Sequence, residues 1–174
     1  LGVMLHGARA VLMVGDQAQL PPFTKWKGAQ AAGYSTSLMA RLAAPRRDMH
    51  GLPVFMLTEQ YRMHPTVCAI VSQSFYRGKL VTAPTAAAAR AYPMPVSFVE
   101  VAGQEERLGL SFVNPQEVDV VVRLAQLFIK HARFAPAQLV VLTFYNAQRE
   151  HLRKALASEG LAVEVTTVDA MQGR

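Results

Sequence analysis

The fold is decided by residues 139–166, which read LVVLTFYNAQREHLRKALASEGLAVEVT. The stretch opens with an uninterrupted apolar run, 139–142, which is typical of a strand buried on both faces. Asn146 is a residue type that caps helices, and the apolar positions after it recur at helical spacing until Gly160. Residues 163–166, Val-Glu-Val-Thr, predict another strand. Strand, helix and strand in this order predict a parallel α/β sheet.

Three further segments predict strands upstream of this unit. Two are short apolar runs, residues 10–14 and 54–57, which we expect to be buried, and residues 96–101 alternate weakly. Residues 17–33 contain Pro21-Pro22 and predict a loop. Residues 83–95 contain four successive alanines and three prolines, and they predict a surface connector.

Three helix starts are readable in the same part of the chain. A short helix is predicted over residues 37–42, ending before Pro45. Two longer helices are predicted from His64-Pro65 and Asn114-Pro115, because proline at the first helical position loses no hydrogen bond. Their inward faces are predicted from apolar spacing as Val67, Ile70, Val71 and Phe75 in the first, and Val118, Val121, Val122, Ala125 and Phe128 in the second.

Polar clusters follow the predicted strands. They are Asp16–Gln19, Gln60–Arg62, Thr143–Asn146 and Thr167–Gln172. Ligands of parallel α/β sheets bind beyond the carboxyl ends of the strands, so this placement predicts a ligand site there.

The side chains in these clusters suit a nucleotide, although each also has a structural interpretation. Asp16 can hold Mg²⁺, and Gln19 can bridge a phosphate oxygen and a water. Arg62 can clamp a phosphate, and Tyr61 can stack on a base. Taken singly, the first cluster also reads as a Gly-Asp turn, Arg62 as a surface charge and His64 as a helix cap.

The composition excludes several classes of protein. Hydrophobic residues make up 51% and charged residues 17% of the 174, which excludes global disorder. The net charge of +6 suits a polyanionic partner, but the basic residues are scattered. The single cysteine, Cys68, excludes an internal disulfide, fits a reducing compartment and is expected in the core. The histidines lack ligand-like spacing, so we predict no metal site, and no apolar run is long enough for a membrane span.

Four motifs in this order give the chain a recognisable pattern. They are GDQAQLPP (15–22), EQYRMHP (59–65), TFYNAQ (143–148) and TTVDAMQGR (166–174), with SLMARL (37–42) and SFYRGKL (74–80) between them. From about residue 10 onward the chain resembles superfamily-1 helicases of the nonsense-mediated-decay type, a group that includes senataxin and the immunoglobulin mu-binding helicase. Phe144 replaces a usual proline and Met171 a usual phenylalanine, exchanges that we expect to change packing more than chemistry.

The resemblance implies a RecA-like α/β fold, with a parallel sheet carrying helices on both faces and incomplete at both ends. Residues 1–45 correspond to the end of a first RecA-like domain, and residues 46–174 to most of a second. The implied parent is an ATP-dependent helicase or translocase moving 5′ to 3′ on single-stranded RNA or DNA. It would be cytoplasmic or nuclear, with its Mg²⁺ ligands upstream of Leu1 and the rest of its first RecA-like domain as the partner of this segment.

The resemblance also implies roles for individual residues. Asp16 and Gln19 belong to the motif that closes the first domain, with Gln19 sensing the γ-phosphate. Tyr61 stacks near the adenine, and Arg62 reaches the γ-phosphate from the second domain, so Gln19 and Arg62 are the catalytic candidates. The resemblance assigns nucleic-acid binding to Thr143, Tyr145, Asn146, Thr167 and Asp169. It assigns nucleotide binding also to Gln172 and Gly173.

No Gly-x-x-x-x-Gly-Lys-Ser/Thr occurs among the eleven glycines. We therefore expect the chain by itself to be inactive as an ATPase. A non-catalytic nucleic-acid-binding RecA-like module stays open as an alternative. A metabolic α/β enzyme is disfavoured because no nucleophile–base set is visible.

Overall fold

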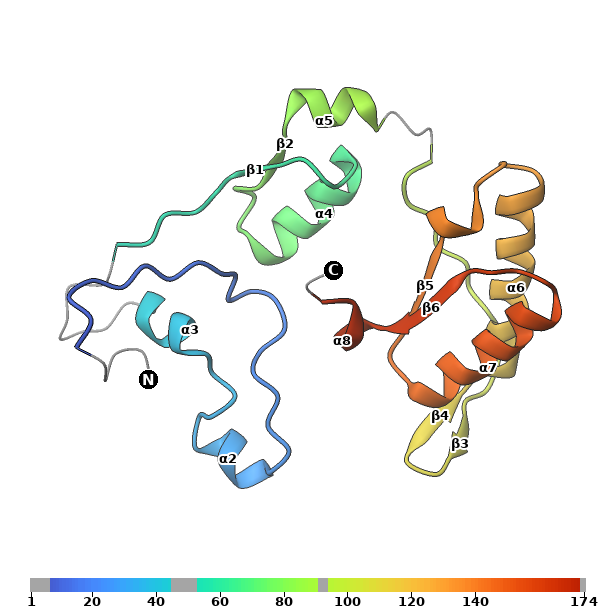
Figure 1. The fold of residues 1–174 in the computed structure, drawn as a ribbon, viewed down its shortest axis with the longest axis horizontal. Coiled ribbons are helices and arrows are strands. Elements are labelled where there is room, and N and C mark those ends of the chain that lie inside the picture. The colour runs from blue at the N-terminus through green and yellow to red at the C-terminus, as the bar shows by residue number, and fades with distance from the viewer. Residues whose placement is uncertain (1–6, 45–52, 91–93, 173–174) are drawn as a thin grey trace. The chain divides into compact units, whose positions relative to one another are not determined.

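The computed structural model describes residues 7–44, 53–90 and 94–172. The chain divides into two compact units, Leu1–Ser97 and Phe98–Arg174 (Figure 1). The predicted boundary between residues 45 and 46 lies in the segment 45–52, which is outside the described residues.

The second unit is organised around two parallel strands. β5 (Val140–Thr143) and β6 (Glu164–Thr167) pair in register, with Val141 opposite Val165, and α7 (Asn146–Ser158) connects them (Figure 1). The chain leaves α7 through Gly160, whose φ of 69° is readily adopted only without a side chain. The strand–helix–strand prediction from residues 139–166 is confirmed.

The core of this unit lies between α7, α6 (Pro115–Lys130) and the two strands. Leu152 and Leu156 of α7 are almost completely buried against Val165, and Val118 and Ala125 bring α6 into the same cluster. Burying a leucine side chain stabilises a fold by roughly 1.5–3 kcal/mol. These two leucines therefore make α7 the centre of the packing.

The other face of β5 is open among the described residues. Val140 and Leu142 are 42% and 49% exposed, and they alternate with Val141, which packs into the core. The resemblance implied helices on both faces of the sheet. Among the described residues, helices cover only one face of β5.

A hairpin precedes α6. β3 (Glu106–Leu108) and β4 (Ser111–Val113) are antiparallel and joined by a two-residue turn, where Gly109 adopts a φ of 62°. A positive φ at the first turn position favours glycine and matches the twist of a hairpin. No sequence pattern had predicted a strand at β3.

The start of α6 is tied to α7 by a buried amide. Asn114 caps α6 as predicted, because its Oδ1 accepts hydrogen bonds from the Gln116 and Glu117 amides at 3.1 and 3.2 Å. Gln148 of α7, only 5% exposed, accepts from the Asn114 amide at 2.9 Å and donates to Glu117 at 3.1 Å. One glutamine therefore satisfies polar groups at the entrance of a neighbouring helix.

We expect Gln148→Ala to lower the free energy of unfolding by about 1–3 kcal/mol, because the buried Asn114 amide would lose its partner. Urea denaturation of the chain followed by circular dichroism measures this. Gln116→Ala, on the exposed side of α6, is the matched control and should stay within about 0.5 kcal/mol of the parent sequence. Equal effects of the two substitutions would contradict the prediction.

The first unit contains α2 (Lys27–Ala31), α3 (Leu38–Ala43), β1 (Glu59–Gln60), α4 (Pro65–Phe75), β2 (Val81–Thr82) and α5 (Pro84–Ala89). β1 and β2 pair in parallel. The predicted starts of α3 and α4 are confirmed: Ser37 Oγ accepts from the Ala40 amide, and His64 Nδ1 accepts from the Thr66 amide, both at 3.1 Å. None of the described helices combines the length and the apolar character needed to cross a lipid bilayer.

Three predicted strands do not form. Residues 10–14, 54–57 and 96–101 have no strand structure, and Leu12 and Phe55 are 89% and 90% exposed. A strand exists only when a neighbour pairs with its backbone groups, and no described strand pairs with these segments. Consequently Asp16 follows no strand, and Gln60 lies within β1.

Other corrections concern helices. α2 lies inside the predicted loop 17–33, and α5 lies inside the predicted connector, with Ala86 buried. On α4 the buried residues are Cys68 and Ser72, whereas Ile70 and Phe75 of the predicted face are 53% and 63% exposed, because burial depends on which side of the helix finds a partner. On α6, Phe128 is 38% exposed.

Candidate functional site

The Asp16 carboxylate organises the turn that carries Gln19. Its Oδ1 accepts from the Ala18 amide at 2.9 Å, and its Oδ2 accepts from the Gln19 Nε2 at 2.9 Å. The same Oδ2 also accepts from the hydroxyl of Tyr76 at 2.5 Å, 60 positions along the chain. The local part of this arrangement is a Gly-Asp turn, as one sequence interpretation had it, and the Tyr76 contact is an addition that no local pattern indicates.

The charge states of this pair follow from the contacts. Partial burial would raise the pKa of the Asp16 carboxyl, but hydrogen bonds from Tyr76, Gln19 and the Ala18 amide outweigh it and hold that pKa below its usual value. The hydrogen bond to Asp16, then desolvation, raises the pKa of Tyr76 to about 12.

The signs of these two shifts give a pH window. The Asp16 contribution to stability is present above the usual pKa of an aspartate and is lost as the pH falls through the lowered value. The Tyr76 contribution is complete below a pH of 10.0 and is lost as the pH rises through about 12. The Asp16–Tyr76 contact is therefore intact throughout the neutral range.

The EQYRMHP segment is held in shape by Gln60. Its Oε1 accepts from the Arg62 and Met63 amides at 2.8 and 2.6 Å, and its Nε2 donates to the Met63 carbonyl and to Thr82 Oγ1 at 2.9 and 2.6 Å. Gln60 belongs to one of the polar clusters, but its sequence context predicts no role for it. Four hydrogen bonds from one amide indicate a residue that fixes the backbone of the turn.

Tyr61 and Arg62 project from this ordered turn. Tyr61 is 61% exposed and donates a hydrogen bond to Glu59 at 3.1 Å. Arg62 is also exposed, and its guanidinium has no hydrogen bond or ion pair within the described residues. A rigid backbone with an uncommitted guanidinium and an accessible ring can receive an anion and a flat ring system.

In the second unit, polar side chains gather where β5 and β6 end. Thr143 and Thr167 are opposite each other in the strand pair, and each is 9% exposed. Thr143 Oγ1 accepts from the Tyr145 amide at 3.3 Å, and the Tyr145 ring meets Phe112 edge-on at a centroid distance of 5.2 Å. The two threonines shape the strand ends, while Tyr145 stays 41% exposed.

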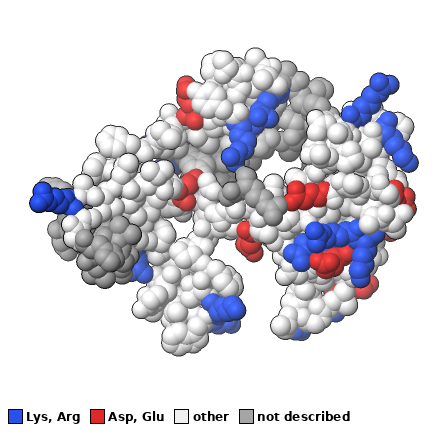
Figure 2. Space-filling model, in the orientation of Figure 1, with Lys and Arg blue, Asp and Glu red and all other residues white. Residues whose placement is uncertain are grey.

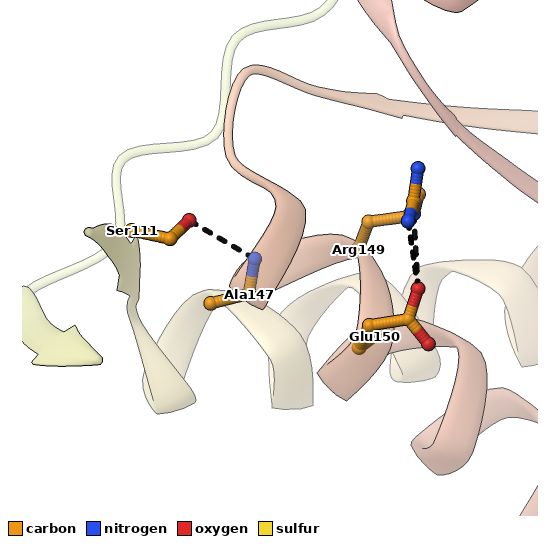
Figure 3. Close-up of polar contacts among 4 residues, drawn as sticks. All are labelled: Ser111, Ala147, Arg149 and Glu150. Atoms are coloured by element: carbon orange, nitrogen blue, oxygen red, sulfur yellow. Dashed lines mark hydrogen bonds and ion pairs between the residues drawn. The ribbon is translucent and has the colours of Figure 1, made fainter. Parts of the chain in front are cut away.

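The prediction that Asn146 caps α7 is wrong. Asn146 is the first residue of the helix, the cap position is Tyr145, and no side chain at that position accepts a hydrogen bond. Ser111 of β4 takes over, accepting from the Ala147 amide at 3.1 Å (Figure 3). The Asn146 side chain is exposed and not needed by the helix start.

The charges on α7 are partly paired. Arg149 and Glu150 form an ion pair at 2.9 Å that is open to solvent (Figure 3), and exposed pairs of this kind contribute at most about 1 kcal/mol. Figure 2 shows Lys and Arg side chains at several separate places on the face in view, with carboxylates among them. The scattered basic charge expected from the sequence is seen again at this surface.

The remaining candidates follow β6. Asp169 lies in the first turn of α8 (Val168–Met171) and Gln172 follows that helix, both exposed, and Gly173 lies outside the described residues. Within those residues, no group of three His, Cys, Asp or Glu side chains is arranged to hold a metal ion. Each unit thus carries its own set: Asp16, Gln19, Tyr61 and Arg62 in the first, and the strand-end residues in the second.

A family profile described as an AAA domain matches residues 34–174. The chain belongs to the AAA-domain family. Within it, the chain is of the superfamily-1 helicase type, because its relatives include the probable helicase senataxin of Mus musculus, 36% identical over 191 residues and covering the whole chain. The regulator of nonsense transcripts 1 homolog of Drosophila melanogaster is 35% identical over 97% of the chain, and the DNA-binding protein SMUBP-2 of Mus musculus is 33% identical over 99%. The sequence resemblance and the RecA-like α/β class are confirmed.

This AAA-domain chain spans a small part of those relatives. It covers 7% of the senataxin, 15% of the Drosophila homolog and 18% of SMUBP-2. The relatives are thus several times longer than the chain.

Proposed function

We propose that this chain is part of an ATP-dependent helicase or translocase that couples nucleoside triphosphate hydrolysis to 5′ to 3′ movement on single-stranded RNA or DNA. The observation that carries the proposal is the Gln60-ordered turn with its uncommitted Arg62 guanidinium. A preorganised cation aimed at a transferring phosphoryl group stabilises the charge of the transition state. The relation to ATP-dependent helicase upf1 of Schizosaccharomyces pombe, 33% identical over 98% of the chain, supports ATP as the nucleotide.

On this proposal the nucleotide-binding roles are assigned residue by residue. Tyr61 stacks near the base, Arg62 binds the γ-phosphate, and Gln19 orients the same phosphate or the attacking water. Asp16 holds Gln19, and Gln172 and Gly173 contribute after β6. Mg²⁺ supplies charge neutralisation for the phosphates when bound, and we place its ligands upstream of Leu1.

The single strand is assigned to the ends of β5 and β6. Exposed Tyr145 and Asn146 are the side chains suited to direct contact, and exposed Asp169, in the motif after β6, is a further candidate. The buried Thr143 and Thr167 support these positions. We further propose the division into residues 1–45 and 46–174, with the rest of the first RecA-like domain as partner. The free, buried Cys68 fits a cytoplasmic or nuclear protein.

A comparison of the chain with its full-length parent tests the function. We expect no ATP turnover by the 174-residue chain, because it contains no phosphate-binding Gly-Lys-Ser/Thr loop. The parent should hydrolyse ATP faster with single strand and unwind a duplex with a 5′ overhang. Phosphate release and strand displacement measure both.

Turnover by the purified chain above the blank would refute the first expectation. A parent that binds single strand but neither hydrolyses ATP nor unwinds would favour the alternative, a non-catalytic nucleic-acid-binding module.

A further inference from the structure

The hydroxyl of Tyr76 joins two segments that the motif order assigns to different RecA-like domains. Asp16 lies in residues 1–45 and Tyr76 in residues 46–174, yet both belong to one compact unit and their side chains meet at 2.5 Å. Tyr76 is half-buried. None of the motif roles assigned above includes it.

Tyr76 is held firmly at the end of α4. Its amide and that of Gly78 both donate to the Ser72 carbonyl, at 2.9 and 3.0 Å, and the Leu80 amide donates to Ser72 Oγ at 3.0 Å. Arg77 and Gly78 take positive φ values of 54° and 72°, which turn the chain sharply after Tyr76. The phenol is therefore presented by a fixed helix end.

The Asp16 carboxylate, which accepts the Tyr76 hydrogen bond, is also held by other contacts. Oδ2 of Asp16 accepts from Tyr76 and from Gln19 Nε2, while Oδ1 accepts from the Ala18 amide. The Gln19 side chain also interacts with the Tyr76 hydroxyl, and this contact lowers the pKa of Tyr76 against the larger rise caused by Asp16. The direction of the Gln19 amide thus depends on Asp16 and on Tyr76, and the direction of the Asp16 carboxylate also depends on Tyr76.

We propose that Tyr76 is a positioning residue that orients Gln19, both directly and through Asp16, and ties the turn at residues 15–19 to helix α4. This inference rests on the proposed ATPase function for its catalytic consequence.

The test uses Tyr76→Phe in the full-length parent, which removes one oxygen and keeps the ring. Tyr34→Phe is the matched control, since Tyr34 is 70% exposed. We expect Tyr76→Phe to lower the strand-stimulated kcat about three- to tenfold, with the KM for ATP within about twofold. This is less than the roughly 10- to 150-fold that a lost hydrogen bond to a charged group corresponds to, because Asp16 keeps its contacts with the Ala18 amide and Gln19. In a Gln19→Ala background the same substitution should have no further effect on kcat.

Hydrogen exchange provides a readout that does not require ATPase activity. Amide exchange of the segment 16–19 should be about three- to tenfold faster in Tyr76→Phe and unchanged in Tyr34→Phe, because the Ala18 amide loses a well-placed acceptor. Unchanged exchange, or defects of Tyr76→Phe and Gln19→Ala that multiply, would overturn the positioning role. If exchange rises in a parent that lacks ATPase activity, the positioning contact holds and the proposed function fails instead.

Discussion

Replacing Arg62 by alanine in the full-length parent is expected to lower kcat for ATP by a factor on the order of 10³, as for other arginines that stabilise phosphoryl transfer. The backbone of the turn should survive, because it is held by the Gln60 side chain rather than by the Arg62 guanidinium. Single-strand binding without nucleotide should be unchanged. Steady-state ATPase and fluorescence-anisotropy titrations with a labelled oligonucleotide measure the two effects.

Two further variants sharpen this test. Arg62→Lys keeps the charge but loses the two-pronged geometry, so it should recover only part of the rate. Arg90→Ala, an exposed arginine at the end of α5, is the matched control and should leave kcat unchanged. An unaltered kcat in Arg62→Ala would reject the assignment of Arg62 to the γ-phosphate.

Gln19→Ala is expected to leave ATP binding nearly unchanged and to impair ATP hydrolysis and unwinding. One neutral hydrogen bond contributes about 0.5–1.5 kcal/mol, so nucleotide affinity should stay within a few-fold. Strand-stimulated ATPase and unwinding should fall about 10²-fold, the loss seen when one preorganised group facing a developing charge is removed. ATP affinity, ATPase with and without single strand, and unwinding should be measured on one preparation.

Gln17→Ala is the control for this experiment. Gln17 is exposed, lies in the same turn and donates to none of the described residues. A collapse of affinity with a preserved stimulation ratio would make Gln19 a binding residue and refute the sensor role. Equal behaviour of the Gln17 and Gln19 variants would favour a solvated loop glutamine.

The sequence identified features that depend on neighbours a few residues away. The starts of α3, α4 and α6 were predicted at Ser37, His64 and Asn114, because a cap is a hydrogen bond to an amide two or three positions along the chain. The β5–α7–β6 unit was predicted because each of its elements carries a local pattern. The two strands then pair with each other in the structure. The family followed from motif order alone.

The candidate site was predicted as a set of residues but not as an arrangement. Gln19 and Arg62 were found because they belong to distinctive strings. The residues that orient them, Gln60 and Tyr76, were quoted without a role, since a glutamine or tyrosine in a polar segment has no pattern that reveals its partner. The Asp16–Tyr76 contact spans 60 positions, and only folding brings its two ends together.

What the sequence by itself determined are the starts of α3, α4 and α6, the parallel pair in the second unit and the family. The tertiary structure alone decided which apolar segments become strands, which face of α4 is buried and which residue caps α7. Residues 10–14 satisfy the strand pattern but have no described partner, and Ser111 replaces Asn146 from another element. The physical reason is that strand pairing, burial and distant caps each need a second surface, whose position no local pattern specifies.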